Sequence, residues 1–201
     1  MSTTLDLMRH GEPVGGRKYR GQIDDPLSEK GWAQMQAAVG ASVFGEQVPW
    51  TRIVSSPLVR CRAFAETLAD RHGLPLTLDA RLREVGFGEW EGKSAAEIEQ
   101  DTPGTLERFK ADPVNARPAG AEPLADFHAR VAASLDDLLA RHTDQHVLLV
   151  GHAGVIRMAF AWALHIPLEH AYRVEVATAS FTRFRFDATR ASLIFHGGSL
   201  A

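Results

Sequence analysis

The chain has 201 residues, enough for one domain with a sizeable buried core. Its composition, 45% hydrophobic and 23% charged, is ordinary for a soluble globular protein. Because the formal net charge is -3, no overall positive field attracts nucleic acid or an anionic membrane. Any anion-binding site must therefore be built locally from a few arginines.

The first half of the chain alternates short apolar runs with helical patterns. Residues 5–8 and 52–55 predict two buried strands. Apolar residues at helical spacing predict helices at 28–43 and 58–72. Cys61, the only cysteine, lies within the second helical pattern, which favours a small buried side chain over a nucleophile. A single cysteine also excludes an intrachain disulfide and indicates a reducing compartment.

Between about residues 90 and 145 the pattern becomes helical. Residues 94–97 have the spacing of a capping box, and Thr102-Pro103 predicts a further helix start, with threonine as N-cap and proline following it. A longer helix predicted at 124–142 carries its apolar residues on one face. We interpret this region as a helical insertion beside the sheet and not as a separate domain.

The last part of the chain predicts a third buried strand at 147–150, a helix at 155–164 and two closing strands within 174–196. Short apolar runs that alternate with helices are typical of a parallel sheet covered on both faces. We therefore predict an α/β fold, a three-layer α/β/α sandwich with a mostly parallel central sheet. A small helical insertion is expected over the active site, and a single domain is expected over 1–201.

Conspicuous polar side chains follow each of the three predicted strands. Arg9 and His10 come after the first strand, Arg60 shortly after the second, and His152 after the third. Ligands of an open α/β sheet bind beyond the carboxyl ends of the strands, so we expect these side chains to converge. Guanidinium groups match the geometry of phosphate oxygens, and a neutral imidazole is a competent nucleophile toward phosphorus. The pattern indicates phosphoryl chemistry.

Five stretches of the chain resemble, in order, motifs of the histidine phosphatase superfamily, the phosphoglycerate-mutase-like proteins. These stretches are 7–12 (LMRHGE), 21–31, 55–63, 82–92 and 151–157. The agreement in order covers most of the chain, from residue 5 to residue 157. It implies the fold predicted above and a phosphatase that works through a phosphohistidine intermediate.

The resemblance also implies roles for individual residues. His10 is expected to be the nucleophile, and Arg9, Arg60 and His152 are expected to hold the phosphoryl group. Glu84 is expected to protonate the leaving alcohol and then to help water attack the phosphohistidine. No metal and no other cofactor is expected, because the arginines neutralise the charge that a metal ion neutralises elsewhere.

One position departs from the family pattern. Many relatives carry an asparagine six residues after the nucleophilic histidine, where this chain has Gly16. We expect Gln22, Ser56 or a backbone N–H to replace that phosphate donor. Gln22 is therefore included among the expected substrate contacts, and so is Ala153, which follows the second histidine.

The sequence favours hydrolysis of a small phosphorylated metabolite. The run Arg-His-Gly-Glu-Pro, together with residues 26–35, looks most like α-ribazole phosphatases of cobalamin biosynthesis, so α-ribazole 5′-phosphate is the first substrate hypothesis. Alternatives are a broad-specificity sugar-phosphate phosphatase, a phosphoglycerate mutase, and a non-catalytic module that binds a phosphorylated ligand. The basic run 17–20 is either a solvated loop or a contact for further substrate charge. Arg83 is either a surface residue or a supplement to the pocket.

The remaining expectations concern location and partners. The first residues lack the charged and apolar regions of a signal peptide, and no apolar run approaches the ~20 residues of a membrane span. We therefore expect a cytoplasmic protein with no nucleic-acid or membrane partner. The oligomeric state stays open, with a homodimer as one option.

Overall fold

A six-stranded sheet forms the middle layer of the protein. In the computed structural model, which describes residues 2–40 and 48–200, the strand order is β3-β2-β4-β1-β5-β6. The strands are β1 (Thr3–Arg9), β2 (Arg52–Ser55), β3 (Leu76–Leu78), β4 (His146–Gly151), β5 (Phe181–Phe186) and β6 (Ala191–Gly198). The first four strands of that order run parallel, whereas β5 is antiparallel to β1 and β6 to β5. The predicted mostly parallel sheet is confirmed.

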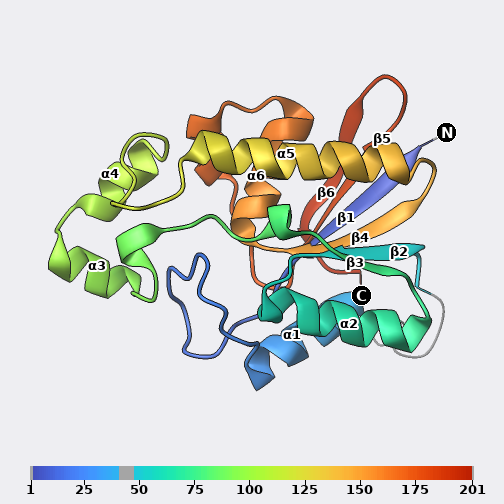
Figure 1. Ribbon diagram of the computed structural model, residues 1–201, viewed down its shortest axis with the longest axis horizontal. Helices are drawn as coiled ribbons and strands as arrows, with labels where there is room; N and C mark the ends of the chain where they lie inside the picture. The colour runs from blue at the N-terminus through green and yellow to red at the C-terminus, as the bar shows by residue number, and fades with distance from the viewer. Residues whose placement is uncertain (1, 41–47, 201) are drawn as a thin grey trace.

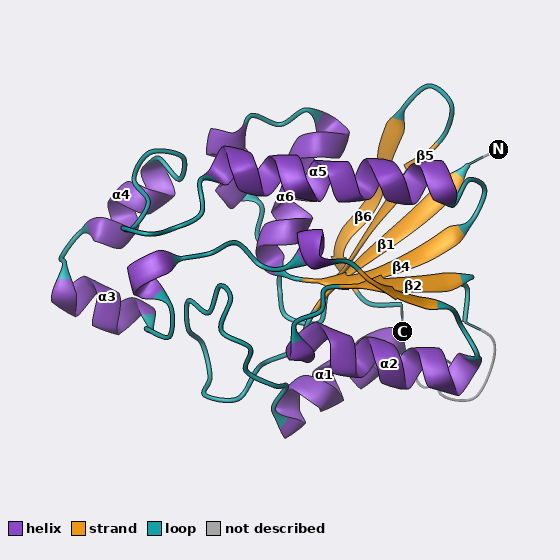
Figure 2. Ribbon diagram, viewed as in Figure 1, coloured by secondary structure: helices purple, strands orange, loops and turns teal. Residues whose placement is uncertain are grey.

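Helices cover both faces of this sheet, which confirms the three-layer arrangement (Figures 1 and 2). On one face lie α1 (Glu29–Val39) and α2 (Val59–His72), and on the other lie α5 (Leu124–Arg141) and α6 (Ala153–Leu164). The short helices α3 (Ala95–Asp101) and α4 (Thr105–Ala111) project on the side toward which β1 and β4 run. Short 3₁₀ segments are η2 (Ala80–Leu82), η3 (Gly88–Trp90) and η4 (Leu168–Arg173).

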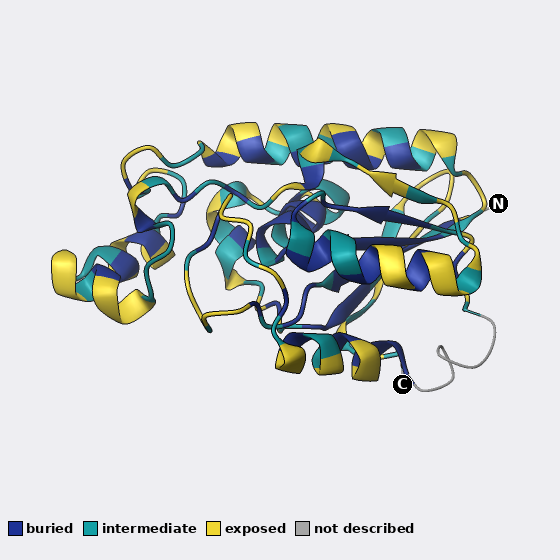
Figure 3. Cartoon of the chain, turned by 60° about the horizontal axis from the view of Figure 1, so that its bottom comes forward, coloured by how far each residue is buried: buried dark blue, intermediate teal, exposed yellow. Residues whose placement is uncertain are grey.

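The core lies on both sides of the sheet because successive strand residues point to opposite faces. In β1, Leu5 and Leu7 pack with Phe127 of α5, whereas Met8 packs with Phe64 of α2. The side chains of Leu5, Leu7, Met8 and Phe127 are fully buried. Figure 3 shows the same pattern, with dark blue strands inside and exposed outer faces on the helices. The continuous apolar runs of the sequence therefore reflect burial on both faces.

Two predicted helix boundaries need correction. Helix α1 ends at Val39 and not at 43, because Gly40 follows it with a φ of 85°; residues 41–43 lie outside the described part of the chain. Thr102 does not begin a helix. It follows the last turn of α3, and α4 begins only after Gly104. The physical reason is the Glu99 carboxylate, which accepts the backbone N–H groups of Gly104 and Leu106 at 2.7 and 2.8 Å and so caps α4.

Other local predictions agree with the structure. Ser94 and Glu97 form the predicted capping box at the start of α3.

The sequence does not predict strand β3, because its three residues are partly or fully exposed at the sheet edge and carry no apolar run. No helix in the described residues is both long and apolar enough to cross a membrane.

Candidate active site

The carboxyl ends of β1, β4 and β2 bring the predicted polar side chains together. Arg9 stands opposite Gly151 in the β1–β4 register, and the His10 N–H continues the pairing by donating to the Gly151 carbonyl at 3.0 Å. His152 follows β4 directly as the N-cap of α6. Arg60 lies in the first turn of α2, shortly after β2. The convergence expected from the sequence is therefore present.

Two buried imidazole rings occupy the centre of this edge. The ring centroids of His10 and His152 are 5.2 Å apart, with the planes inclined by 67°. The Nδ1 atom of His10 lies 2.7 Å from the Gly11 carbonyl. Because a carbonyl only accepts hydrogen bonds, Nδ1 carries the proton, and Nε2 of the neutral ring keeps its lone pair.

The surroundings keep both rings neutral. Burial, followed by the positive charges of Arg60 and Arg9, holds the pKa of His10 well below its ordinary value of 6.5. Burial and then Arg60 lower the pKa of His152 in the same direction. A neutral imidazole is the form that can attack phosphorus, and the lowered pKa keeps His10 in that form.

Two arginines beside His10 have unsatisfied donors. Arg60 is 1% exposed and donates through Nη1 to the Ile23 carbonyl at 2.7 Å and through Nη2 to the Gly21 carbonyl at 3.0 Å. Arg9 donates through Nη1 to the Val176 carbonyl. Within the described residues, the buried Nε atoms of Arg9 and Arg60 have no hydrogen-bond partner. A guanidinium N–H that has no acceptor in the protein can donate to a phosphate oxygen, so these two neighbouring groups fit a site for an anion.

The Arg9 guanidinium remains cationic near neutral pH. Burial lowers the pKa of Arg9 to about 10, although the Glu84 carboxylate opposes this shift. Neither Arg9 nor Arg60 forms an ion pair within 4.0 Å among the described residues. The positive charge at this edge of the sheet is therefore not neutralised by a carboxylate of the described residues and can attract an anion.

Glu84 reaches the same site from the segment after η2. Its Oε2 accepts the Gly154 N–H at 3.2 Å, and its Oε1 accepts the Val85 N–H at 3.0 Å. Gly154 is in the first turn of α6, directly after His152 and Ala153. A Cβ atom on Gly154 would lie 2.2 Å from Glu84 Oε1. The absence of a side chain at Gly154 therefore lets the carboxylate lie against the α6 N-terminus, where the helix dipole favours negative charge.

Close packing of two backbone segments requires glycine at the third position of the Arg9-His10-Gly11 triplet. A Cβ atom on Gly11 would lie 2.2 Å from the backbone oxygen of Gly31. A Cβ on Gly31 would in turn lie 2.1 Å from the backbone oxygen of Glu12. The loop after β1 and the start of α1 thus touch through their backbones. This contact fixes the direction of the chain that carries His10.

Gln22, Ala153 and Ser56, the remaining expected contacts, lie around this centre. The Gln22 side-chain amide donates to the Glu84 carbonyl. Ala153 is the first residue of α6 and is half-buried. Ser56 Oγ shares a 2.8 Å hydrogen bond with His152 Nε2. Ser56 therefore orients the second histidine.

The basic run 17–20 divides into two parts. Arg17 and Lys18 are exposed, but Arg20 is buried. The Arg20 guanidinium binds Asp25 at 2.9 Å and the carbonyl of Gly16 at 2.6 Å. Arg20 thus stabilises the loop in which Gly16 replaces the family asparagine.

Cys61 is buried, as predicted, with its sulfur 3.6 Å from His152 Nε2. Burial raises the pKa of the Cys61 thiol, so it packs under the histidine as an uncharged group. Among the described residues, no group of three His, Cys, Asp or Glu side chains is placed to hold a metal ion.

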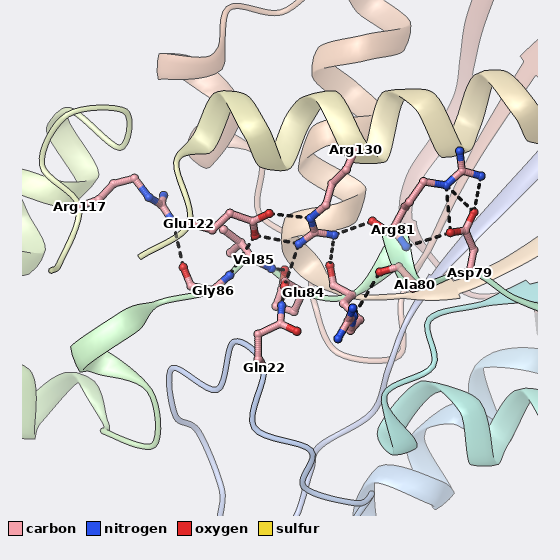
Figure 4. A network of polar contacts seen from close by, with 11 residues as sticks. Gln22, Asp79, Ala80, Arg81, Glu84, Val85, Gly86, Arg117, Glu122 and Arg130 are labelled. Carbon is pink, nitrogen blue, oxygen red and sulfur yellow. Dashed lines mark hydrogen bonds and ion pairs between the residues drawn. The ribbon is translucent and has the colours of Figure 1, made fainter. Parts of the chain in front are cut away.

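Sequence reasoning missed Arg130 and Glu122. Figure 4 shows the Arg130 guanidinium against the backbone of the Glu84 segment, with Glu122 beside it. Arg130 Nη2 donates to the Glu84 carbonyl at 3.1 Å. The apolar periodicity of α5 indicates which of its faces is buried, but it carries no signal for a bond to a distant loop.

Comparison with known proteins agrees with this geometry. A model of the histidine phosphatase superfamily (branch 1) matches residues 5–197. A glucosyl-3-phosphoglycerate phosphatase of Mycobacterium tuberculosis is 37% identical over 175 residues, covering 82% of this chain and 76% of that protein. A phosphoserine phosphatase of Hydrogenobacter thermophilus is 29% identical over 190 residues, covering 92% and 88%.

Solved structures show the same fold. The native structure of a mycobacterial glucosyl-3-phosphoglycerate phosphatase matches with a TM-score of 0.86 and 31% identity, covering 99% of this chain and 100% of that one. A candidate α-ribazole-5′-P phosphatase of Escherichia coli matches with a TM-score of 0.83 at 24% identity, covering 98% and 96%, which supports the fold alone. The chain belongs to branch 1 of the histidine phosphatase superfamily and is a phosphatase.

Proposed function

We propose that the protein hydrolyses a small phosphorylated metabolite through a phosphohistidine on His10. One observation carries the proposal: the neutral His10 ring, with Nδ1 donating to the Gly11 carbonyl, lies beside the half-buried Arg9 and the buried Arg60. This combination supplies a nucleophile and an anion cradle at the same place. A module that only binds phosphate has no need for an imidazole held in one tautomer.

In the first step, His10 Nε2 attacks phosphorus and the bond from phosphorus to the alcohol oxygen breaks. Arg9 and Arg60 stabilise the negative charge on the phosphoryl oxygens, and His152 lies next to them. Glu84, in its protonated form, gives its proton to the departing oxygen. The products of this step are the free alcohol and phosphohistidine.

In the second step, water attacks the phosphorus and the bond from phosphorus to His10 Nε2 breaks. The Glu84 carboxylate takes the proton of the attacking water, and inorganic phosphate and neutral His10 result. The N–H groups of Gly154 and Val85 bind the two carboxylate oxygens and so fix the orientation of the group that takes this proton.

The surroundings favour a polar alcohol as the rest of the substrate. A hollow of about 490 Å³ lies beside the Glu84 segment. Its described lining residues are Gln22, Ala80, Arg83, Gly86, Gly88, Glu91, Gly120, Glu122 and Arg130. Apart from Arg130, whose N–H groups are all used within the protein, this lining offers hydrogen-bond donors and acceptors. It includes no aromatic side chain for stacking on a flat base.

We therefore place a hydroxyl- or carboxylate-bearing phosphate ester, such as a sugar or glycerate derivative, ahead of α-ribazole 5′-phosphate. The names of the relatives, glucosyl-3-phosphoglycerate phosphatase and phosphoserine phosphatase, support the same order. Because residues of this chain resemble those of α-ribazole phosphatases, α-ribazole 5′-phosphate remains one of the substrates to be assayed. We also propose hydrolysis over mutase activity.

The substrate proposal is tested by kcat/KM for a panel of phosphate esters. The panel contains glucosyl-3-phosphoglycerate, phosphoserine, several sugar phosphates, 3-phosphoglycerate and α-ribazole 5′-phosphate. We expect the polar aliphatic esters to react fastest and to release inorganic phosphate. A rate at least about tenfold higher for α-ribazole 5′-phosphate, or isomerisation of 3-phosphoglycerate without phosphate release, would overturn the assignment.

The nucleophile is tested separately with p-nitrophenyl phosphate. We expect His10→Ala to abolish turnover and to remove an acid-labile, base-stable phosphoenzyme that wild type forms. His170→Ala, on the half-exposed segment η4, is the matched control and should keep wild-type activity. Full activity of His10→Ala would show that another group accepts the phosphoryl group.

A further inference from the structure

The side chain of Arg130, on α5, crosses the backbone of the segment that carries Glu84 (Figure 4). Its Nη1 donates to the carbonyls of Arg81 and Arg83 at 2.5 and 2.7 Å. Its Nη2 donates to the carbonyl of Glu84 itself at 3.1 Å. One guanidinium group from a distant helix therefore binds three backbone carbonyls, two before Glu84 and that of Glu84 itself.

Glu122 completes the contact. Its carboxylate accepts Arg130 Nε at 2.6 Å and Nη2 at 2.8 Å, and both side chains are about one-fifth exposed. Glu122 Oε2 also accepts the Gly86 N–H at 3.2 Å. The Arg130–Glu122 pair thus binds carbonyls before and at Glu84 and an amide after it.

The guanidinium of Arg130 has no spare donor. Its five hydrogen bonds match the five N–H groups that an arginine carries. The same group lies 4.5 Å from the ring centroid of Phe127, which fixes its plane. A lysine ammonium, with three donors and no planar fork, does not reproduce this arrangement.

Gln22 holds the same point from the opposite side. Its amide donates to the Glu84 carbonyl that Arg130 also binds. Gln22 stands between Gly21 and Ile23, whose carbonyls accept the two Nη groups of Arg60. The backbone of Glu84 is therefore tied both to α5 and to the loop that positions Arg60.

The geometry points to Arg130 as the positioning residue of Glu84. By holding the carbonyls of residues 81, 83 and 84, it sets where the Glu84 carboxyl group lies relative to His10 and the leaving oxygen. Arg130 itself touches neither His10 nor the phosphate arginines through any hydrogen bond in the described residues. Its loss should impair proton transfer to the leaving group while phosphate binding persists. This inference rests on the proposed function.

Leaving-group dependence tests the inference. Arg130→Lys and Arg130→Met are assayed with p-nitrophenyl phosphate, whose leaving group needs little protonation, and with an alkyl phosphate, whose leaving group needs a proton. We expect kcat for the alkyl ester to fall at least about tenfold more than kcat for the nitrophenyl ester. The inhibition constant of inorganic phosphate should change by less than about twofold. Equal losses for both esters would overturn the positioning role.

Arg81→Met is the matched control. The Arg81 side chain also ties η2 to α5, through ion pairs with Asp79 and Asp137 at 2.7 and 2.8 Å, but it does not contact Glu84. We expect this variant to lower the melting temperature while the ratio of alkyl to nitrophenyl rates stays at the wild-type value. The same ratio change in Arg81→Met and Arg130→Met would show a general loss of structure and would overturn the inference.

A double variant provides the sharpest comparison. If Arg130 acts through Glu84, adding Arg130→Met to Glu84→Gln should leave the leaving-group dependence unchanged. A further change would show that Arg130 acts elsewhere. If Arg130→Met does not fold, Glu122→Gln weakens the same pair conservatively and should show a smaller effect of the same kind. Equal losses for both esters in Glu122→Gln would also count against the inference.

The failure of this inference differs from that of the proposed function. If only the inference fails, Glu84→Gln still shows leaving-group dependence and the Arg130 variants do not. If the proposed function fails, His10→Ala keeps its activity and Glu84→Gln reacts with both esters like wild type.

Discussion

The imidazole rings of His10 and His152 pack in a T-shaped, edge-to-face arrangement, with 5.2 Å between their centroids. They come from distant parts of the sequence but from adjacent strands, because β1 pairs with β4 in parallel register. Arg60 lowers the pKa of both rings, and burial has the largest effect on each. The site therefore keeps two neutral imidazoles next to positively charged guanidinium groups.

The first prediction concerns pH. A lowered pKa keeps His10 neutral, and hence nucleophilic, below the ordinary value of 6.5, so kcat/KM should be lost only as pH falls through that lowered value. Arg60→Met removes a cation and should move the pKa of His10 back toward 6.5. Titration of the ring nitrogens by NMR in the free protein measures this shift. A His10 ring already protonated at pH 6.5 in wild type would contradict the argument.

The second prediction concerns the acid. Glu84→Gln keeps the side-chain shape but cannot transfer a proton. We expect about a tenfold loss of kcat for p-nitrophenyl phosphate and a loss of about 10²–10⁴ for alkyl phosphates. Glu89→Gln, at an exposed position of the same segment, should stay within twofold of wild type. Equal losses for all leaving groups would exclude an acid role for Glu84.

The third prediction uses the close approach of Gly154 to Glu84. Gly154→Ala places a Cβ atom 2.2 Å from Glu84 Oε1, so the carboxylate has to move away from the α6 N-terminus. We expect kcat for alkyl phosphates to fall about tenfold or more. Wild-type kinetics in Gly154→Ala would show that the Glu84 position is not critical.

The fourth prediction concerns stability away from the site. Asp6 is fully buried and accepts hydrogen bonds from Arg183, Trp50 and His146. Asp6→Ala leaves these donors without their acceptor and should lower the free energy of unfolding by about 3–5 kcal/mol.

Urea denaturation measures this change. Glu66→Ala is the control, because it removes an exposed ion pair to Arg62 at 3.8 Å and should cost less than about 1 kcal/mol. Similar losses in both variants would show that the buried cluster around Asp6 adds no special stability.

Much of the fold could be read from local patterns. The runs at 5–8, 52–55 and 147–150 predicted β1, β2 and β4, because strands buried on both faces are apolar throughout. Short or edge elements were missed, and β3 is the example. Its residues carry no continuous apolar run, so only pairing with β2 makes them a strand.

The start of α4 shows a different limit. Thr102-Pro103 has the local pattern of a helix start, yet the Glu99 carboxylate caps the helix two residues later than that pattern predicts. A side chain from the preceding helix thus outweighed the local preference.

The sequence alone was enough to identify the candidate site residues, through residue type, position after a strand and resemblance to a family. These residues are Arg9, His10, Gly11, Arg60, Glu84 and His152. Only the tertiary structure decided how they are held. The proton on His10 Nδ1, the place of Glu84 on α6 and its support by Arg130 depend on contacts between segments far apart in the chain. Periodicity reports which face of an element is buried, but a hydrogen bond across the fold depends on where the connecting loops bring its two partners.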